Sequence, residues 1–459
     1  MTLSAFRDRA AQWFNRSNNR RILAAALTVG IFSVVVKLAA MSKELAVAYR
    51  FGTGDAIDAF LIAFLLPSLA INIVSGSFSA AFTPLYVEVR ENCGAAAAFE
   101  LLRSASAGTA LVVLPVTLLV FAGVPVLPLL ATGFSAEKLA LTEALFLILL
   151  PTIALNGFIA VWSAALNCEG HFAWAALAPI GVPILTLVMV LLTGGILGGY
   201  ALALGTVMGY ALQCGILAGA LATARMPVLP RWGGATPELT RALRQYVPMV
   251  VGAALTSSSW AIGQAMAATL PSGSVAALNY GNKIPALLSE IGSMAIATAL
   301  LPHFSLMVAR KEWAAIRHTL RVYGRLIAVV TIPFTLVAIY LSPTIVRLLF
   351  ERGAFGREDT QRVAEVLSFY LLQVPFVMLG MLFVRLASSL QRNQLLLLGA
   401  AILLPLNVVL NGLFMRWLGA AGIALATSVV YFVSCAYLFA AVERALRAIE
   451  RSHVSTAKQ

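Results

Sequence analysis

The sequence predicts an all-α polytopic membrane protein with about twelve transmembrane helices in two six-helix lobes. Composition is the first observation: 60% of the 459 residues are hydrophobic and only 11% are charged, against about 25% charged in soluble domains. The second is the recurrence of apolar runs of about 20 residues, the length of a membrane-spanning helix. The third is an internal repeat that divides these runs into two sets.

The apolar runs give the predicted spans in order. In the first half they lie near 22–42, 56–78, 105–131, 140–162, 173–193 and 196–222. In the second half they lie near 247–270, 276–300, 326–346, 366–388, 394–415 and 420–441.

The segments between the runs define the predicted domains. The first residues are basic and contain aromatic side chains, which is typical of a helix lying at the membrane interface. No cleavage pattern of small residues follows the first apolar run, so we expect a retained first span. The predicted domains are a cytoplasmic interfacial segment (1–21), an N-lobe (22–224), a cytoplasmic linker (225–246), a C-lobe (247–445) and a cytoplasmic tail (446–459).

Basic residues predict the orientation, because cytoplasmic loops retain Lys and Arg. With the N-terminus inside, most of the 32 basic residues fall in cytoplasmic segments. Both termini are therefore predicted to be cytoplasmic. The net charge of +13 then reflects this bias and contact with anionic lipid headgroups, so membrane lipids are expected as partners and nucleic acid is not.

Two sequence echoes indicate an internal duplication. Residues 199–203 resemble residues 422–426, and each segment is followed by a tyrosine and a cysteine at similar distances. Two proline pairs share a spacing of 17 residues: Pro67 with Pro84, and Pro285 with Pro302. Since each half has an even number of spans, both halves enter the membrane from the same side, and such a pair encloses a central cavity.

Lysines interrupt two apolar runs in matching halves. Lys37 lies inside the first span, and Lys283 lies about 10 Å along the span that begins near residue 276. A charge at membrane depth costs about 2.5–3.5 kcal/mol, so these lysines indicate a bound anion. The alternatives are snorkelling to the interface or pairing with Glu44 or Glu290.

Lysine is a compact point charge that suits a phosphate which must later leave. Two ammonium groups facing a cavity would bind a phosphate or pyrophosphate. The outer end of the first span also gathers Lys43, Glu44 and Asp58. The two carboxylates are expected to orient the lysines or to help release the substrate.

Signatures of catalysis are absent from the sequence. It has no Walker A motif, its four histidines are scattered, and its four cysteines show no metal-ligand spacing. We therefore expect a transporter and not an enzyme, with no cofactor and no metal. The drive is expected to be an ion gradient or the membrane potential.

Several motifs resemble the MurJ/MviN family of the MOP exporter superfamily. The first half carries Lys43-Glu44, Phe51-Gly52, Asp58-Ala-Phe60, Pro67, Phe78, Ala81-Phe82-Thr-Pro84, Leu166-Asn167, Phe172 and Ala178-Pro179. The second half carries Gly273-Ser-Val275, Tyr280, Leu301-Pro302 and Phe350-Glu-Arg-Gly-Ala-Phe355. The resemblance covers nearly the whole chain.

The resemblance implies a flippase that moves undecaprenyl-pyrophosphate-linked sugars, lipid II above all, across the bacterial inner membrane. It assigns pyrophosphate binding to Lys37, Lys43 and Lys283, where the family usually has arginines, and an acidic residue is usual where this chain has Asn282. The family's sodium site would need acidic residues in spans 7, 11 and 12, and these are not evident in this sequence. The nearest polar groups there are Asn407, Asn411 and Thr427.

The resemblance predicts a flippase for lipid II or a related lipid-linked oligosaccharide that works by alternating access. Cell-wall or polysaccharide assembly proteins are expected as further partners. The alternatives are an exporter of exopolysaccharide repeat units and a MATE-like antiporter for organic cations, which would need buried carboxylates at its centre. A third possibility is a non-transporting scaffold of a polysaccharide assembly.

Overall fold

Helices form nearly all of the computed structural model, which describes residues 18–231, 250, 252–254 and 257–456. These described residues contain no strand, and the predicted all-α fold is confirmed. Contacts between residues divide the chain into two compact units. Unit 1 is drawn from Met1–Arg50, Ala63–Leu127 and Leu139–Ala254, and unit 2 from Phe51–Ile62, Pro128–Lys138 and Leu255–Gln459.

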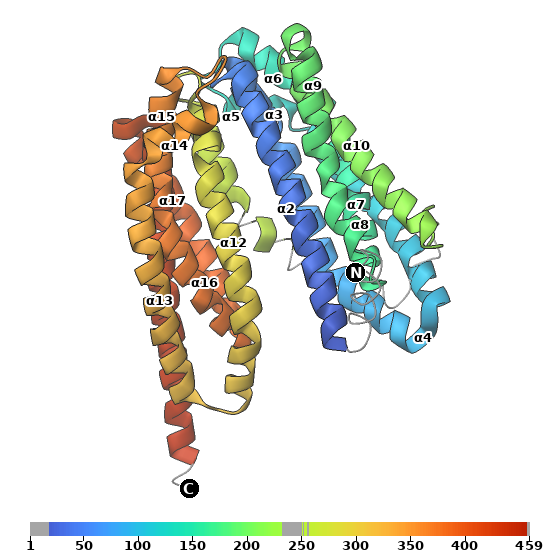
Figure 1. The fold of residues 1–459 in the computed structure, drawn as a ribbon, viewed down its shortest axis with the longest axis vertical. Helices are drawn as coiled ribbons and strands as arrows, with labels where there is room; N and C mark the ends of the chain where they lie inside the picture. Colours follow the sequence, from blue (N-terminus) through green and yellow to red (C-terminus); the bar gives the residue numbers. More distant parts are fainter. Residues whose placement is uncertain (1–17, 232–249, 251, 255–256, 457–459) are drawn as a thin grey trace, which may run out of the picture. The chain divides into compact units, whose positions relative to one another are not determined.

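Each unit is a bundle of helices (Figure 1). Those lying wholly or mostly in unit 1 are α2 (Asn18–Phe51), α4 (Leu65–Phe121), η1 (Val124–Val126), α6 (Ala136–Leu149), α7 (Pro151–Cys168), α8 (Phe172–Leu177), η2 (Ala178–Ile180), α9 (Gly181–Leu197) and α10 (Gly199–Thr223). Those of unit 2 are α3 (Asp55–Ala63), α5 (Leu127–Leu130), α12 (Ser274–Ala309), α13 (Trp313–Tyr340), α14 (Ser342–Phe350), α15 (Arg357–Leu371), α16 (Gln373–Ser389) and α17 (Gln394–Thr456).

Eight helices of the described chain are long and apolar enough to cross a membrane. The last of them holds two predicted spans, 394–415 and 420–441, because the helical backbone breaks at Gly419. The predicted spans 22–42 and 276–300 lie within α2 and α12. The span 247–270 falls partly outside the described residues.

Unit 1 is built around α7, which packs against α4 and α10, while α10 also packs along α9 (Figure 1). A Cβ atom at Gly209 of α10 would lie 2.4 Å from Val182 Cα of α9. Glycine therefore permits this close approach, as small residues commonly do between membrane helices. The buried core includes Tyr86, Leu102, Trp162, Leu166 and Leu217.

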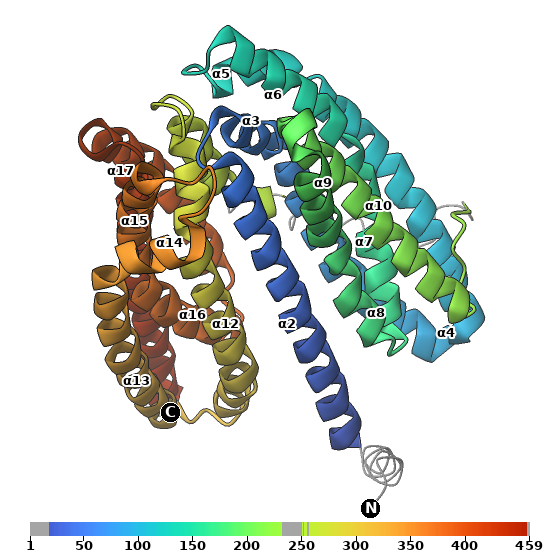
Figure 2. The same cartoon turned by 45° about the horizontal axis from the view of Figure 1, so that its top comes forward.

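Unit 2 is built around α16, which packs between α12 and α17 (Figure 2). Its core includes Phe304, Ile316, Leu386 and Leu446. At one end, the ring of Tyr280 on α12 lies 5.3 Å from that of Phe350 and 5.7 Å from that of Phe355. These rings anchor the connection between α14 and α15 to α12.

Backbone geometry supports the predicted duplication. Gly198 (φ 54°, ψ −131°) and Gly419 (φ 55°, ψ −132°) have the same unusual conformation. Three pairs of residues with left-handed φ are separated by the same 221 positions: Gly52 and Gly273, Gly170 and Gln391, and Gly198 and Gly419. The tyrosine and cysteine of the sequence echo have the same offset, Tyr210 with Tyr431 and Cys214 with Cys435, so the two halves repeat the same turns between helices.

Two segments from the first half of the sequence, 51–62 and 128–138, make their contacts in unit 2. The predicted N-lobe, 22–224, includes both of them. They group with the second half because Asp58 pairs with Lys138 and accepts hydrogen bonds from Gly273 and Ala276. No local sequence pattern reveals these contacts. The predicted domain boundaries otherwise stay predictions.

Candidate functional site

Lys37 lies on an exposed, apolar side of α2. The side chain is exposed, and its neighbours Val34 and Leu38 are 58% and 63% exposed. The lysine thus lies on a surface of α2 whose neighbouring side chains are apolar. This position is where a charge would meet a ligand within the membrane.

Lys43 is held by its neighbour in the sequence. Its Nζ lies 2.7 Å from Glu44 Oε1, and the two side chains are 25% and 14% exposed. Glu44 therefore orients Lys43 and partly cancels its charge. Lys43 follows Lys37 by six residues on the same helix, about 9 Å along its axis.

Lys283 is half-buried on α12 in unit 2. Gln373 Nε2 of α16 donates to Asn282 Oδ1 at 3.4 Å, which ties the two helices together beside the lysine. Glu290 is exposed and lies seven residues further along, on nearly the same face of α12. The structure thus places Lys37, Lys43 and Glu44 on one helix, and Asn282, Lys283 and Glu290 on another. Their binding roles stay predictions.

A buried ion pair joins α3 to the first turn of α6. Asp58 and Lys138 are 1% and 7% exposed, and Lys138 Nζ donates to Asp58 Oδ2 at 2.9 Å. The same Nζ lies 2.6 Å from Asp55 Oδ1 and 4.2 Å from the centre of the Phe134 ring. Two carboxylates and an aromatic face therefore compensate the buried ammonium charge.

Asp58 also caps α12, which begins at Ser274. The backbone N–H groups of Gly273 and Ala276 donate to Asp58 at 2.7 and 2.8 Å. Amides at a helix N-terminus have no partner within the helix, and the helix dipole favours a negative charge there. One carboxylate thus satisfies both a buried lysine and a helix end.

Two glycines let the backbone around this ion pair pack closely. A Cβ atom would lie 2.6 Å from Ala354 O at Gly52, and 2.6 Å from Thr53 O at Gly273. Both glycines have positive φ, which other residues adopt at a cost. The Thr53 hydroxyl donates to the Asp359 carboxylate, which adds a link to α15.

We call this group the clasp. Its members are Thr53, Asp55, Asp58, Lys138, Gly273 and Asp359, with Ser272 and Arg362 at the edge. Ser272 Oγ donates to Asp55 Oδ1 at 2.5 Å, and Arg362 Nη1 donates to Ser272 O at 3.0 Å. The clasp gathers the motif segments 51–52, 58–60, 273–275 and 350–355 in unit 2. These motifs are far apart in the sequence, but the fold brings them together at the clasp.

The lysine that Asp58 contacts is Lys138, a residue that the sequence does not mark as part of a site. The role predicted for Asp58 beside the substrate-binding lysines stays a prediction. The local signal is weak, since Lys138 lies three residues after Ser135, whose Oγ accepts a hydrogen bond from Lys138 N at 3.3 Å. That pattern marks the start of a helix and not the burial of its lysine.

The described residues include no group of three or more His, Cys, Asp or Glu side chains placed to hold a metal ion. At the implied sodium site, Asn411 Nδ2 donates to Asn407 Oδ1 at 3.0 Å, and Thr427 Oγ1 donates to Ile423 O at 3.0 Å. No carboxylate lines the pocket that contains Asn407 and Thr427. A sodium ion there would be a buried charge without a counter-charge, so these neutral groups do not fit it.

Comparisons with known proteins agree with this architecture. The family model described as lipid II flippase MurJ matches residues 47–459. A probable lipid II flippase MurJ of Rhizobium tropici is 29% identical over 440 residues, which cover 91% of this chain and 80% of that protein.

Two solved structures share the fold. A lipid II flippase MurJ in an inward closed conformation aligns with a TM-score of 0.78 at 22% identity, covering 91% of this chain and 87% of that one. An inward-facing MATE family transporter of the MOP superfamily aligns with a TM-score of 0.75 at 14% identity, covering 92% and 99% of the two chains.

Proposed function

Because this chain belongs to the lipid II flippase MurJ family, whose members are membrane transporters and not enzymes, we propose that it flips an undecaprenyl-pyrophosphate-linked glycan. The substrate is lipid II or a related lipid-linked oligosaccharide, moved from the cytoplasmic to the outer leaflet by alternating access. The protein would lie in the bacterial inner membrane with both termini in the cytoplasm.

The observation that carries this proposal is the presence of lysines on apolar helices in both units, Lys37 on α2 and Lys283 on α12. An ammonium group attracts a phosphate more strongly in apolar surroundings than in water, because the lower dielectric constant screens the charges less. Lysine binds as a point charge without the bidentate fork of arginine. We therefore expect the pyrophosphate to be held by charge and to be released readily.

Lys43 would act with Lys37 on the same helix. Its ion pair with Glu44 would weaken its attraction for the substrate until the pyrophosphate displaces the carboxylate. Glu44 would thus set the affinity of this end of α2. Lys283 would bind the same headgroup from α12, with Asn282 and Gln373 fixing the helix beside it.

Alternating access requires units that move as bodies, joined by a few positions that absorb the change. The chain passes from unit 2 to unit 1 at the end of α3 and again directly after Lys138. The clasp anchors both crossings through Asp58 and Lys138. We propose that it stays formed during transport, while the break at Phe64 between α3 and α4 acts as a hinge.

The membrane potential is the proposed drive. It acts directly on an anionic headgroup, at about 2.3 kcal/mol per charge per 100 mV. With the cytoplasm negative, it favours outward movement of the pyrophosphate. Flipping measured in vesicles with an imposed potential and no sodium gradient should therefore proceed, whereas dependence on a sodium gradient alone would refute this drive.

The substrate is tested by rescue of cells depleted of their own lipid II flippase. If lipid II is carried, the chain restores growth at the normal rate, which would exclude exopolysaccharide repeat units as the sole cargo. Failure of rescue despite verified membrane insertion would favour the related oligosaccharide.

A further inference from the structure

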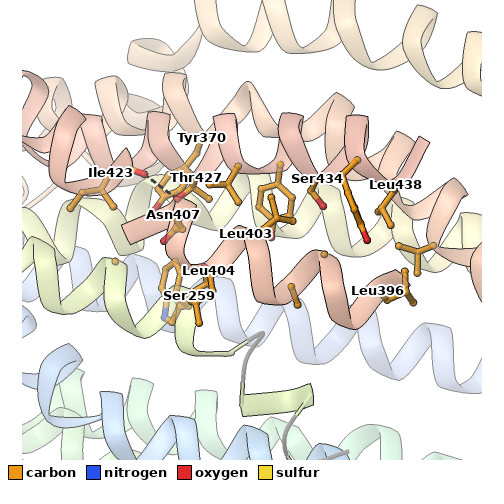
Figure 3. Close-up of a pocket in the computed structure, with 18 of the residues that line it drawn as sticks. Ser259, Tyr370, Leu396, Leu403, Leu404, Asn407, Ile423, Thr427, Ser434 and Leu438 are labelled. Atoms are coloured by element: carbon orange, nitrogen blue, oxygen red, sulfur yellow. Dashed lines mark hydrogen bonds between the residues drawn. The ribbon is translucent and has the colours of Figure 1, made fainter. Parts of the chain in front are cut away.

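Unit 2 contains a pocket with a volume of about 440 Å³ that none of the three lysines lines. Its walls come from the helical segment 257–267, from α15 and α16, and from both parts of α17 (Figure 3). The clasp contributes no lining residue either. The pocket is therefore separate from the groups described above.

The pocket is elongated along α17. Ile423 and Leu438 both line it, and fifteen residues of helix correspond to about 22 Å. Figure 3 shows Asn407, Ile423 and Thr427 toward one end and Leu396 and Leu438 toward the other. Such dimensions suit a single extended chain.

Its mouth is marked by two aromatic residues. Trp260 and Tyr431 line the pocket and are each 41% exposed. Amphipathic rings of this kind favour the boundary between apolar and polar surroundings. A lipid could enter beside them.

The polar groups of the pocket are all uncharged, since none of its lining residues is Asp, Glu, Lys, Arg or His. Gln264 is 3% exposed, and its Oε1 has no hydrogen-bond donor. A buried acceptor of this kind is normally satisfied, so this oxygen calls for a ligand that donates a hydrogen bond.

We propose that this pocket binds an uncharged single-chain lipid whose head carries hydroxyl groups, the chemistry of a monoacylglycerol. A head hydroxyl donates to Gln264 Oε1, and a second reaches the amide of Asn407. The hydrocarbon chain lies along the apolar residues toward Leu396 and Leu438.

The absence of counter-charges from the lining decides the head chemistry. A carboxylate or an amine would be buried without a partner of opposite charge, which is strongly unfavourable. A plain hydrocarbon would leave Gln264 Oε1 unsatisfied. A neutral hydroxyl head meets both requirements. The inference is independent of the proposed flipping, because it uses none of the lysines.

The test is thermal unfolding of the full chain in nanodiscs with four ten-carbon probes: 1-decanoylglycerol, decanoate, decylamine and decane. Decanoylglycerol should raise the Tm, and the other three should not. Gln264→Leu should weaken the apparent affinity for decanoylglycerol roughly fivefold to tenfold, the loss expected for one hydrogen bond. This variant replaces an unsatisfied polar group by an apolar one of similar size, so it should fold.

Two further variants complete the design. Ala400→Trp fills the pocket and should abolish the shift. Gln213→Leu changes an equally buried glutamine of α10 in unit 1, 7% exposed, and should keep the full shift.

Equal shifts in the wild-type chain, Gln264→Leu and Ala400→Trp would overturn the proposal, because the effect would then come from the bilayer. Equal stabilisation by decanoate or decylamine would overturn the assignment of a neutral head. If sodium chloride raised the Tm while choline chloride did not, and Gln264→Leu lost this effect, the proposal would be overturned in favour of a cation site.

Discussion

Replacing Asp58 by Ala tests how strongly the clasp holds unit 2 together. The change removes the carboxylate paired with Lys138 at 2.9 Å and both caps of α12. Breaking a buried ion pair by removing one partner costs about 3–5 kcal/mol. Asp55 still lies 2.6 Å from Lys138 Nζ and retains part of the compensation. We therefore expect a loss near the lower end, about 3 kcal/mol of unfolding free energy.

Asp55→Ala is the matched control, since Asp55 contacts the same lysine but its side chain is 63% exposed. Exposed ion pairs contribute about 0–1 kcal/mol, so this variant should lose less than about 1 kcal/mol. Unfolding titrations in mixed micelles measure both variants. Equal losses, or a loss below about 1 kcal/mol for Asp58→Ala, would refute the reasoning that burial makes this pair strong.

Further predictions concern the glycines and the lysine on α2. Gly273→Ala should cost about 1–2 kcal/mol for its left-handed backbone and about 1–3 more for the contact with Thr53 O. Gly170→Ala should cost only the first amount, because Gly170 has a similar φ of 81° and nothing within 4 Å of its Cβ. Comparable losses in the same unfolding titration would contradict the close packing at Gly273. Glu44→Gln should release Lys43 and raise pyrophosphate affinity up to about fivefold at low salt, with the gain disappearing at high salt. Binding titrations at two ionic strengths check this, and an affinity unchanged at low salt would show that Glu44 does not restrain Lys43.

Much of the fold could be predicted because membrane helices are specified locally, by runs of apolar residues. The break between 394–415 and 420–441 is a clear example, since it falls at Gly419, where the backbone leaves the helical region. The repeat could also be detected in advance, because the segments 199–203 and 422–426, beside the turns at Gly198 and Gly419, keep similar residues.

The clasp could not be predicted, because its partners are distant in the sequence. Lys138 is 80 residues from Asp58, and the α12 amides capped by Asp58 lie more than 130 residues beyond Lys138. Lysine is almost never fully buried unless it is paired. The sequence shows no partner for Lys138, so an exposed position in a loop would be expected for it. For Lys37 and Lys283 the sequence places each charge on its helix. Whether both meet one ligand is decided by tertiary structure, which local patterns do not encode.

The most direct test of the central claim is translocation of fluorescent lipid II by the purified chain in proteoliposomes. Lys37→Ala and Lys283→Ala should each abolish flipping while the protein remains inserted and folded, and Lys283→Arg should retain it because the positive charge is kept. Normal flipping by both alanine variants would contradict pyrophosphate binding by these lysines.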